Sequence, residues 1–238
     1  MKKIGFIGAY DKTDFILYIA KILVELGKRV LLIDATITQK ARYIVPNIQN
    51  SKAYLTEFEG IDVAVGMKSY DEIKAFLRVP PNAELPYDVV LIDTNSAGGV
   101  LSFRINECTN IYFATSMDMY SIKKGVESLS VLKTQLEVTK ILFSNKAKPD
   151  EIQYINYLSE GSNIVWKKDD NGKEDIVYFP YDTNDQMIIF TNQRVSKIKL
   201  KGLSNQFKEG LMYTVNQITD EDSYKDLVRV FRKVERGV

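Results

Sequence analysis

The sequence predicts a doubly wound α/β fold, in which a mostly parallel sheet carries helices on both of its faces. Two apolar runs, residues 29–34 and 87–93, are nearly uninterrupted, as strands that are covered on both faces require. Each of these runs ends in an aspartate. Segments with the apolar spacing of a helix alternate with the strand candidates along the chain, and this alternation is typical of a doubly wound sheet.

The first third of the chain has the pattern of a βαβ unit. An apolar run ends at Gly8, which suits a buried strand that enters a tight turn. The next segment is apolar nearly all round, which indicates a mostly buried helix, and Gly27 is placed to end it. The expected elements up to residue 93 are strands over 3–8, 29–34, 54–58, 61–65 and 87–93 and helices over 15–26 and 70–78.

The rest of the chain continues the alternation and contains no linker, internal repeat or low-complexity tract. The polar residues 167–173 are expected to form a surface hairpin tip. We therefore expect a single domain over residues 1–238, large enough to bury a core without a disulfide or a metal. The expected elements are strands over 110–115, 138–144 and 176–179 and helices over 120–136, 151–158, 207–218 and 223–234.

Charge and composition exclude several classes of protein. Lys plus Arg is 32 and Asp plus Glu is 31, so the formal net charge of +1 argues against a protein that binds polyanions over its whole surface, while a local basic face is allowed. The chain has no histidine and one cysteine, Cys108, which excludes an internal disulfide and histidine-based catalysis. No signal or membrane-spanning segment is visible, so a cytoplasmic protein is expected.

The first strand-to-helix turn is the place where a doubly wound sheet binds ligands. Here this turn ends in Lys12 and Thr13. In a P-loop, such a lysine reaches the β- and γ-phosphates of a nucleotide and the hydroxyl group binds Mg²⁺. The full P-loop pattern is not matched, because Phe6 and Asp11 stand at its two glycine positions. Lys12 and Thr13 also fit ordinary first-turn residues, with Thr13 as a helix cap.

Several segments together resemble the ParA/MinD family of deviant P-loop ATPases, and they occur in the order of that family. The resemblance spans roughly residues 3–218 and implies a P-loop NTPase-like fold with a site for ATP and Mg²⁺. The similar segments are the loop 7–14, the strand 29–34, the strand end 89–94, the segment 115–132, the strand end 142–146 and the turn 179–182.

The resemblance assigns roles to particular residues of that site. Thr13 and Asp93 stand where the family binds Mg²⁺, and Asp34 stands where an acid lies near the attacking water. The two aspartates also fit simple strand ends, and Asn145 also fits a turn residue. The residues at the phosphate-binding and base-binding positions are Gly8, Asp11, Lys12, Thr13, Asn145 and Pro180.

Three positions depart from the family pattern. Ile7 replaces a signature lysine that reaches the partner's nucleotide, Asp11 replaces a glycine beside the phosphates, and Thr36 replaces a second acid. A carboxylate at position 11 would repel phosphate, or it would hydrogen-bond the helix amides that phosphate otherwise occupies. We therefore expect a degenerate loop with a weakened hold on ATP and Mg²⁺, and impaired or lost hydrolysis, with Asp34 as a vestigial catalytic residue.

The resemblance leads to a functional hypothesis. We expect a divergent ParA/MinD-like protein that positions or scaffolds a larger assembly, such as a pilus, secretion or conjugation machine, as the TadZ/CpaE-like branch does. On this hypothesis the protein is not an active enzyme. Two alternatives stay open: a weak ATPase of plasmid or chromosome partition that cycles between monomer and dimer, and a nucleotide-independent accessory that binds DNA.

The same resemblance suggests a homodimer, a protein partner from the larger assembly, and two further surfaces. The last helix has an apolar stripe among basic residues, similar to the membrane-targeting tail of MinD, which would place the protein at the inner face of the membrane. A helix that packs on the sheet would show the same stripe. A second basic cluster lies in an expected loop, where family members meet partners or DNA, although a solvated face also explains it. Its residues are Arg194, Lys197, Lys199 and Lys201.

Overall fold

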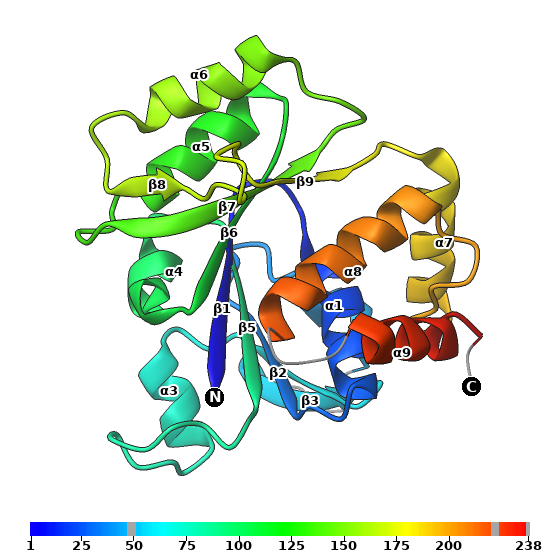
Figure 1. Cartoon of the computed structure of the whole chain (residues 1–238). Coiled ribbons are helices and arrows are strands. Elements are labelled where there is room, and N and C mark those ends of the chain that lie inside the picture. The colour runs from blue at the N-terminus through cyan, green and yellow to red at the C-terminus, as the bar shows by residue number, and fades with distance from the viewer. Residues whose placement is uncertain (47–50, 220–223, 237–238) are drawn as a thin grey trace.

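The computed structural model describes residues 1–46, 51–219 and 224–236, and it places a nine-stranded sheet between two layers of helices (Figure 1). The strands are β1 (Lys2–Ile7), β2 (Val30–Asp34), β3 (Tyr54–Phe58), β4 (Ile61–Val65), β5 (Val89–Thr94), β6 (Asn110–Ser116), β7 (Leu136–Phe143), β8 (Ile164–Trp166) and β9 (Ile176–Phe179). The helices are α1 (Thr13–Glu25), α2 (Ala41–Ile44), α3 (Tyr70–Phe76), α4 (Ala97–Ser102), α5 (Met119–Leu129), α6 (Pro149–Ser159), α7 (Thr183–Arg194), α8 (Asn205–Thr219) and α9 (Tyr224–Arg236).

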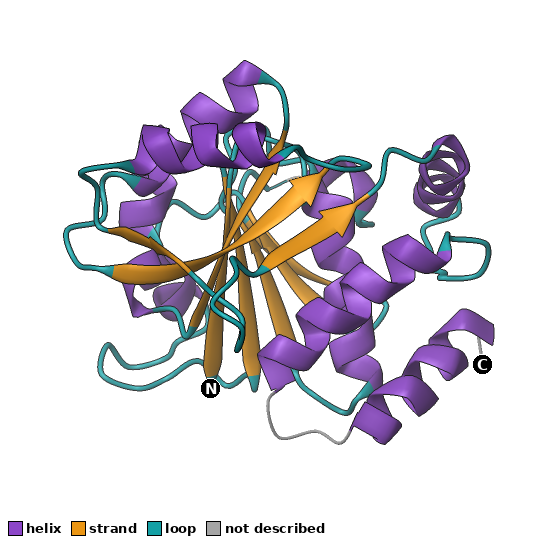
Figure 2. Cartoon of the chain, turned by 45° about the horizontal axis from the view of Figure 1, so that its top comes forward, coloured by secondary structure: helices purple, strands orange, loops and turns teal. Residues whose placement is uncertain are grey.

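The strand order in the sheet is β3-β4-β2-β5-β1-β6-β7-β8, and β9 also pairs with β7. Strand β3 runs antiparallel to β4, whereas the other pairings between the named strands are parallel. The predicted doubly wound, mostly parallel sheet is therefore confirmed (Figure 2). Because β1 lies between β5 and β6, the direction of winding reverses there, and the crevice above the carboxyl end of β1 is where such sheets bind ligands.

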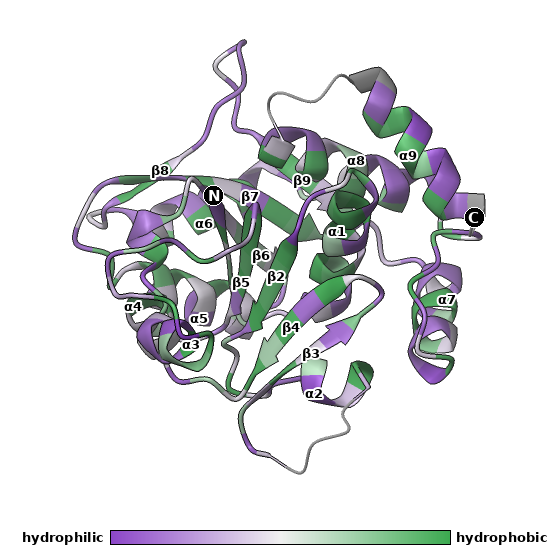
Figure 3. Ribbon diagram, turned by 90° about the horizontal axis from the view of Figure 1, so that it is seen from below, coloured by the Kyte–Doolittle hydropathy of each residue, from purple (hydrophilic) through white to green (hydrophobic). Residues whose placement is uncertain are grey.

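Alternate residues of the central strands enter two separate cores. In β5, Val89 and Leu91 belong to the core beneath α1, α8 and α9, whereas Val90 and Ile92 belong to the core beneath α3, α4, α5 and α6. The strands are accordingly apolar along their length, while polar residues lie toward the outside of the helices (Figure 3). Coverage on both faces explains why the strand segments lack the alternation of a half-exposed sheet.

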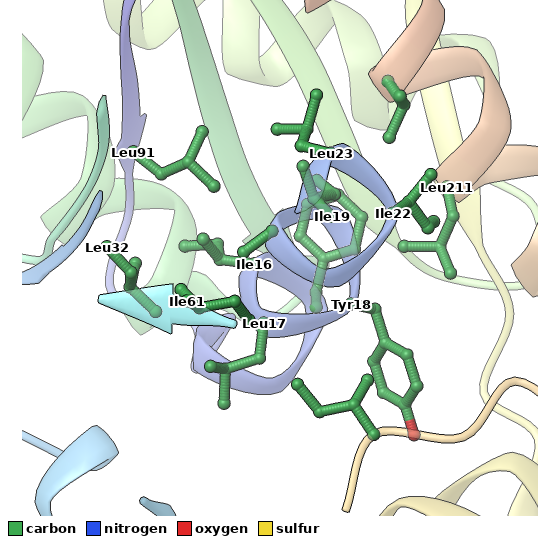
Figure 4. Close-up of a cluster of buried hydrophobic side chains, with 14 of the residues drawn as sticks. Ile16, Leu17, Tyr18, Ile19, Ile22, Leu23, Leu32, Ile61, Leu91 and Leu211 are labelled. Atoms are coloured by element: carbon green, nitrogen blue, oxygen red, sulfur yellow. The ribbon is translucent and has the colours of Figure 1, made fainter. Parts of the chain in front are cut away.

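Helix α1 is the central helix of the first core. Its side chains fill the space between the sheet, represented by Leu32 and Leu91, and Leu211 of α8 (Figure 4). Ile16 and Ile19 have no exposed surface. Truncating a buried side chain of this size typically costs about 2–5 kcal/mol of stability, so the position of α1, and with it the loop before it, is firmly held.

Two sequence-based expectations are corrected by the structure. The helix expected over 120–136 is too long, because α5 ends at Leu129 and Leu136 already belongs to β7, which pairs with β6 and β8. The basic cluster lies only in part in the expected loop, because Arg194 is the last residue of α7 whereas Lys197, Lys199 and Lys201 follow in the loop before α8. Strand pairing and packing between distant segments determine where α5 and α7 end. Such contacts cannot be recognised from the local sequence.

Helix α4 is one of several elements, with α2, α7 and β8, that the sequence analysis did not predict. Its Gly98 and Gly99 each disfavour a helix by about 1 kcal/mol relative to alanine. The tertiary structure requires the second glycine, because a Cβ at Gly99 would lie 2.1 Å from Thr94 Oγ1. The side chain of Ser96 caps the helix by accepting a hydrogen bond from the Gly99 N–H at 3.1 Å.

Two expectations at the periphery agree with the structure. An antiparallel bridge between Lys168 and Glu174 closes the polar hairpin tip. The last helix, expected over 223–234, is present as α9, and Ser223 lies outside the described residues. Within the part of the chain that the structure describes, no helix is long and apolar enough to cross a bilayer.

Candidate functional site

A cavity of about 360 Å³ opens at the carboxyl edge of the sheet, above β1, β2 and β5. The strand register places Asp34 beside Asp93 and Ile7 beside Thr94, so that the ends of the strands converge there. The lining residues come from the loop after β1, the segment between β2 and α2, and the end of β5. They are Ala9, Tyr10, Asp11, Lys12, Thr13, Thr36, Thr38, Lys40, Tyr43, Asp93 and Asn95.

The loop after β1 turns sharply at Gly8. The φ angle of this residue is +149°, and its N–H donates a hydrogen bond to the Thr94 carbonyl at 3.2 Å. A Cβ at this position would lie 1.9 Å from the carbonyl oxygen of Ala114 on β6. Only glycine therefore fits, and the tight turn brings Lys12 and Thr13 over the ends of β1 and β5.

Lys12 is buried and fully engaged by acceptors from the strand ends. Its Nζ lies 2.8 Å from Asp93 Oδ1, and both side chains are 1% exposed. The same ammonium donates to the carbonyl oxygens of Gly8 at 2.9 Å and Thr94 at 3.1 Å. An ammonium group has three donors, so a phosphate would have to replace one of these acceptors to bind Lys12.

Thr13 and Asp93 lie together at the floor of the cavity. Thr13 Oγ1 donates to Asp93 Oδ2 at 3.1 Å. Burial raises the pKa of the Asp93 carboxyl to about 6, and the Lys12 charge opposes that shift. A hydroxyl and a carboxylate oxygen are the kind of hard ligand that Mg²⁺ takes, so these two residues fit the predicted metal position. Over the described residues no group of three or more His, Cys, Asp or Glu side chains could hold a metal ion, so Mg²⁺ here would need phosphate and water oxygens as well.

Asp34 lies beside Asp93 in the sheet but does not line the cavity. Its Oδ1 accepts from Thr36 Oγ1 at 2.6 Å and from the Thr36 N–H at 3.1 Å, and its Oδ2 accepts from the Ala41 N–H at 2.9 Å. Both oxygens of this buried carboxylate thus hold the segment between β2 and α2 in place.

Asp11 lies at the mouth of the cavity and makes contacts on two sides. Its Oδ1 accepts from the Thr13 N–H at 3.2 Å, and its Oδ2 lies 2.5 Å from Lys40 Nζ. Lys40 also pairs with Asp14 at 2.6 Å, and Asp14 accepts a second bond from Gln193 of α7 at 2.8 Å. Burial alone would lower the pKa of the Lys40 ammonium, but Asp14 and Asp11 outweigh it, so that the pKa is raised and the charge is retained.

The two residues at the predicted base-binding positions meet at the ends of β7 and β9. Asn145 Oδ1 accepts from the N–H of Tyr181, which directly follows Pro180, at 2.8 Å. Beside them the ring of Tyr10 stacks on Phe143 at a centroid distance of 4.4 Å. Neither Asn145 nor Pro180 lines the cavity that holds Lys12, so the residues predicted to bind the base lie outside the cavity that contains those predicted to bind phosphate.

The predicted basic surfaces lie away from this cavity. Arg194, Lys197, Lys199 and Lys201 are all exposed, and Lys197 pairs with Glu59 at 2.9 Å. The apolar stripe of α9 is buried in the core beneath α1 and α8. The stripe residues are Leu227, Val230, Phe231 and Val234. A membrane could reach this stripe only if α9 left the core.

Comparisons with known proteins identify the fold. No family model matches the sequence, and no curated protein matches it either. The structure is similar to MinD in the MinC:MinD cell division complex of Aquifex aeolicus, with a TM-score of 0.60 and 14% identity over 94% of this chain and 98% of that chain. It is also similar to a ParA family ATPase from Chlorobium tepidum, with a TM-score of 0.51 and 10% identity over 98% and 97% of the two chains. The chain has the MinD/ParA fold.

A third similar structure with this fold carries a nucleotide analogue. It is a candidate plasmid partition protein from Borrelia burgdorferi bound to AMPPNP, with a TM-score of 0.52 and 12% identity over 98% of both chains. At these identities the likeness concerns the MinD/ParA fold alone.

Two residues of the site were missed by the sequence analysis. Tyr10 stands at a loop position between the motif residues, and its aromatic character gave no signal without knowledge of Phe143. Lys40 lies 29 residues beyond its partner Asp11, and a single lysine in a polar segment carries no recognisable pattern. The hydrogen bonds that hold the β2–α2 segment to Asp34 bring Lys40 to the cavity.

Proposed function

We propose that this chain is a divergent MinD/ParA-like protein that positions or scaffolds a larger assembly and binds a nucleotide without appreciable hydrolysis. The observation that carries the proposal is the convergence of Lys12, Thr13 and Asp93 on a cavity at the switch point of the sheet. Lys12 and Asp93 neutralise each other in the ligand-free protein, and both line a cavity through which a ligand can reach them. A phosphate chain with Mg²⁺ has the charge and the oxygen atoms that this set of residues accepts.

The proposal of lost hydrolysis is supported by the state of Asp34. One of its oxygens accepts a hydrogen bond from Thr36 and the other accepts one from Ala41. Asp34 also does not line the cavity, so neither oxygen is directed at a water molecule there. Thr36 stands where the resemblance implies a second acid, and Ile7 stands where it implies the signature lysine. The site therefore has fewer groups that could activate a water molecule or neutralise negative charge during ATP hydrolysis.

Nucleotide binding is tested by calorimetric titration with Mg·ATP. We expect Lys12→Met to weaken binding at least tenfold, which corresponds to about 1.4 kcal/mol. Lys197→Met is the matched control, because it also removes a paired lysine but one that does not line the cavity. Equal affinity in the wild type and in Lys12→Met would contradict the proposed phosphate site.

Turnover is tested by phosphate release at saturating Mg·ATP. We expect no release above the background that Lys12→Met gives. Release that Lys12→Met abolishes would support the alternative function, a weak ATPase of the partition type.

The scaffolding role is proposed to involve a homodimer and a protein partner from a pilus, secretion or conjugation machine. Ile37 and Tyr43 project beside the cavity with 75% and 82% of their surfaces exposed, and large apolar side chains of this kind favour contact with another protein. We expect a dimer in light scattering both with and without ATP, since Ile7 replaces the lysine that would couple two nucleotide sites.

The matched variants for the dimer are Tyr43→Asp and Tyr157→Asp. The second changes an equally aromatic, 65% exposed side chain on α6 in the opposite helix layer. We expect Tyr43→Asp alone to shift the protein toward monomer. A monomer-to-dimer shift that requires ATP would instead favour a cycling partition ATPase.

A further inference from the structure

Asp11 occupies the position of an anion between a helix N-terminus and a lysine. One oxygen accepts from the Thr13 N–H at the start of α1, and the other lies 2.5 Å from Lys40 Nζ. Backbone N–H groups at a helix N-terminus together with a lysine are the standard recognition elements for phosphate. The carboxylate of Asp11 therefore stands where a phosphate group of a bound ligand would find its partners.

The partners of Lys40 divide into a fixed one and an exchangeable one. Asp14 is 17% exposed and is held from its other side by Gln193, so it anchors the lysine. Asp11 is 52% exposed and lies at the mouth of the cavity, where it can turn toward solvent. Lys12, by contrast, is fully occupied by Asp93 and two carbonyl groups. Two lysines line the cavity, and of these only Lys40 has a solvent-accessible partner, Asp11, that a ligand can replace.

We propose that Lys40 is a phosphate ligand of this site and that Asp11 is an internal competitor that a phosphate displaces. This inference rests on the proposed nucleotide binding and adds to it a lysine supplied from the β2–α2 segment of the same chain. The positive charge near the phosphates is then supplied within one subunit, and binding does not depend on dimer formation.

The experiment separates a phosphate ligand from a mere counter-ion of Asp11. Mg·ATP is titrated calorimetrically into the wild type, Asp11→Asn, Lys40→Met and the double variant Asp11→Asn/Lys40→Met, each checked for folding by circular dichroism. Asparagine keeps the size of Asp11 and its acceptor for the Thr13 N–H but removes the competing charge. We expect Asp11→Asn to tighten binding at least threefold, and Lys40→Met to weaken it at least tenfold in the Asp11→Asn background. Lys40→Arg in that background should lose less than threefold.

The outcomes distinguish this inference from the proposed function. If Lys40→Met leaves the affinity of the Asp11→Asn protein unchanged, Lys40 only neutralises Asp11, and the inference is overturned while nucleotide binding stands. If neither the wild type nor Asp11→Asn binds Mg·ATP, both the proposed nucleotide binding and the role of Lys40 are wrong. Lys197→Met in the Asp11→Asn background serves as the control for loss of a lysine outside the cavity.

Discussion

Two lysines of this protein, Lys12 and Lys140, are buried to the same extent, but their surroundings differ. Each side chain is 1% exposed and each pairs with a carboxylate. Lys12 lines a cavity, and its other acceptors are backbone carbonyl groups. Lys140, on β7, is surrounded by side chains: it pairs with Glu174, donates to Asn156 at 2.6 Å and lies 4.1 Å from the centroid of the Trp166 ring.

The difference teaches that burial of a charge does not by itself indicate a ligand site. The Lys140 cluster closes on itself, because Asn156 also donates to Glu174 at 2.5 Å and Trp166 Nε1 donates to Ser159 at 3.0 Å. It ties β7, α6, β8 and the segment just before β9 together. The Lys12 cluster borders a cavity on one side, where a ligand can replace one of its acceptors. The predictions below test this distinction.

The largest expected effect is on stability. Lys140→Met should lower the free energy of unfolding by about 3 kcal/mol, because it leaves the partly buried Glu174 carboxylate and the Asn156 amide without their shared cation. Lys12→Met should cost about half as much, since its carbonyl partners face a cavity that water can enter and Asp93 can take up a proton. Urea denaturation followed by the fluorescence of Trp166, the one tryptophan of the chain, measures both variants. A larger loss in Lys12→Met would reverse the assignment of the two clusters.

The pH dependence of stability gives the next effect. The pKa of Asp93 is raised from 3.8 to about 6 in the folded protein, mainly by burial, so between these values the folded state binds more protons than the unfolded state. Stability should therefore fall as the pH rises from about 4 to about 6, by roughly 2 kcal/mol, and Asp93→Asn should abolish that fall.

Lys140 should respond in a different pH range. Burial lowers its pKa, although Glu174 opposes the shift, so its contribution makes stability rise with pH in the alkaline range below the ordinary lysine value. Thermal melts at pH 4, 6, 8 and 10 on the wild type, Asp93→Asn and Lys140→Met separate the two effects. An acid-range slope that persists in Asp93→Asn would show that another group causes it.

The smallest effects concern Asp11. Asp11→Gly should tighten Mg·ATP binding about tenfold, or about 1.4 kcal/mol, because glycine removes the charge and allows the backbone to approach phosphate. The same change should lower the ligand-free stability by about 1 kcal/mol, because the Thr13 N–H loses its acceptor. Calorimetry and ligand-free melts are measured side by side. Lower stability without any gain in affinity would mean that Asp11 is a helix cap and not a competitor of phosphate.

Much of the fold could be predicted from local pattern. The strands β1, β2 and β5 and the helix α1 are apolar runs of the right length, and burial on both faces leaves few alternatives. The elements that were missed or misplaced, α2, α4, α7, β8 and the end of α5, depend on contacts with segments distant in the chain. Gly99 is the clearest case, since it opposes a helix locally and is required by the neighbouring Thr94.

The sequence by itself determined that a turn with Lys12 and Thr13 follows the first strand and that Asp34 and Asp93 end two further strands. Parallel strands bring their carboxyl ends to one edge, so this much of the site follows from the order of the elements. Only the tertiary structure decided which groups face the cavity. In the folded chain, Asp34 accepts hydrogen bonds from the β2–α2 segment. Lys12 pairs with Asp93, and Lys40 pairs with Asp11. These outcomes depend on hydrogen-bond geometry and burial between segments far apart in the chain, which no local pattern of residues encodes.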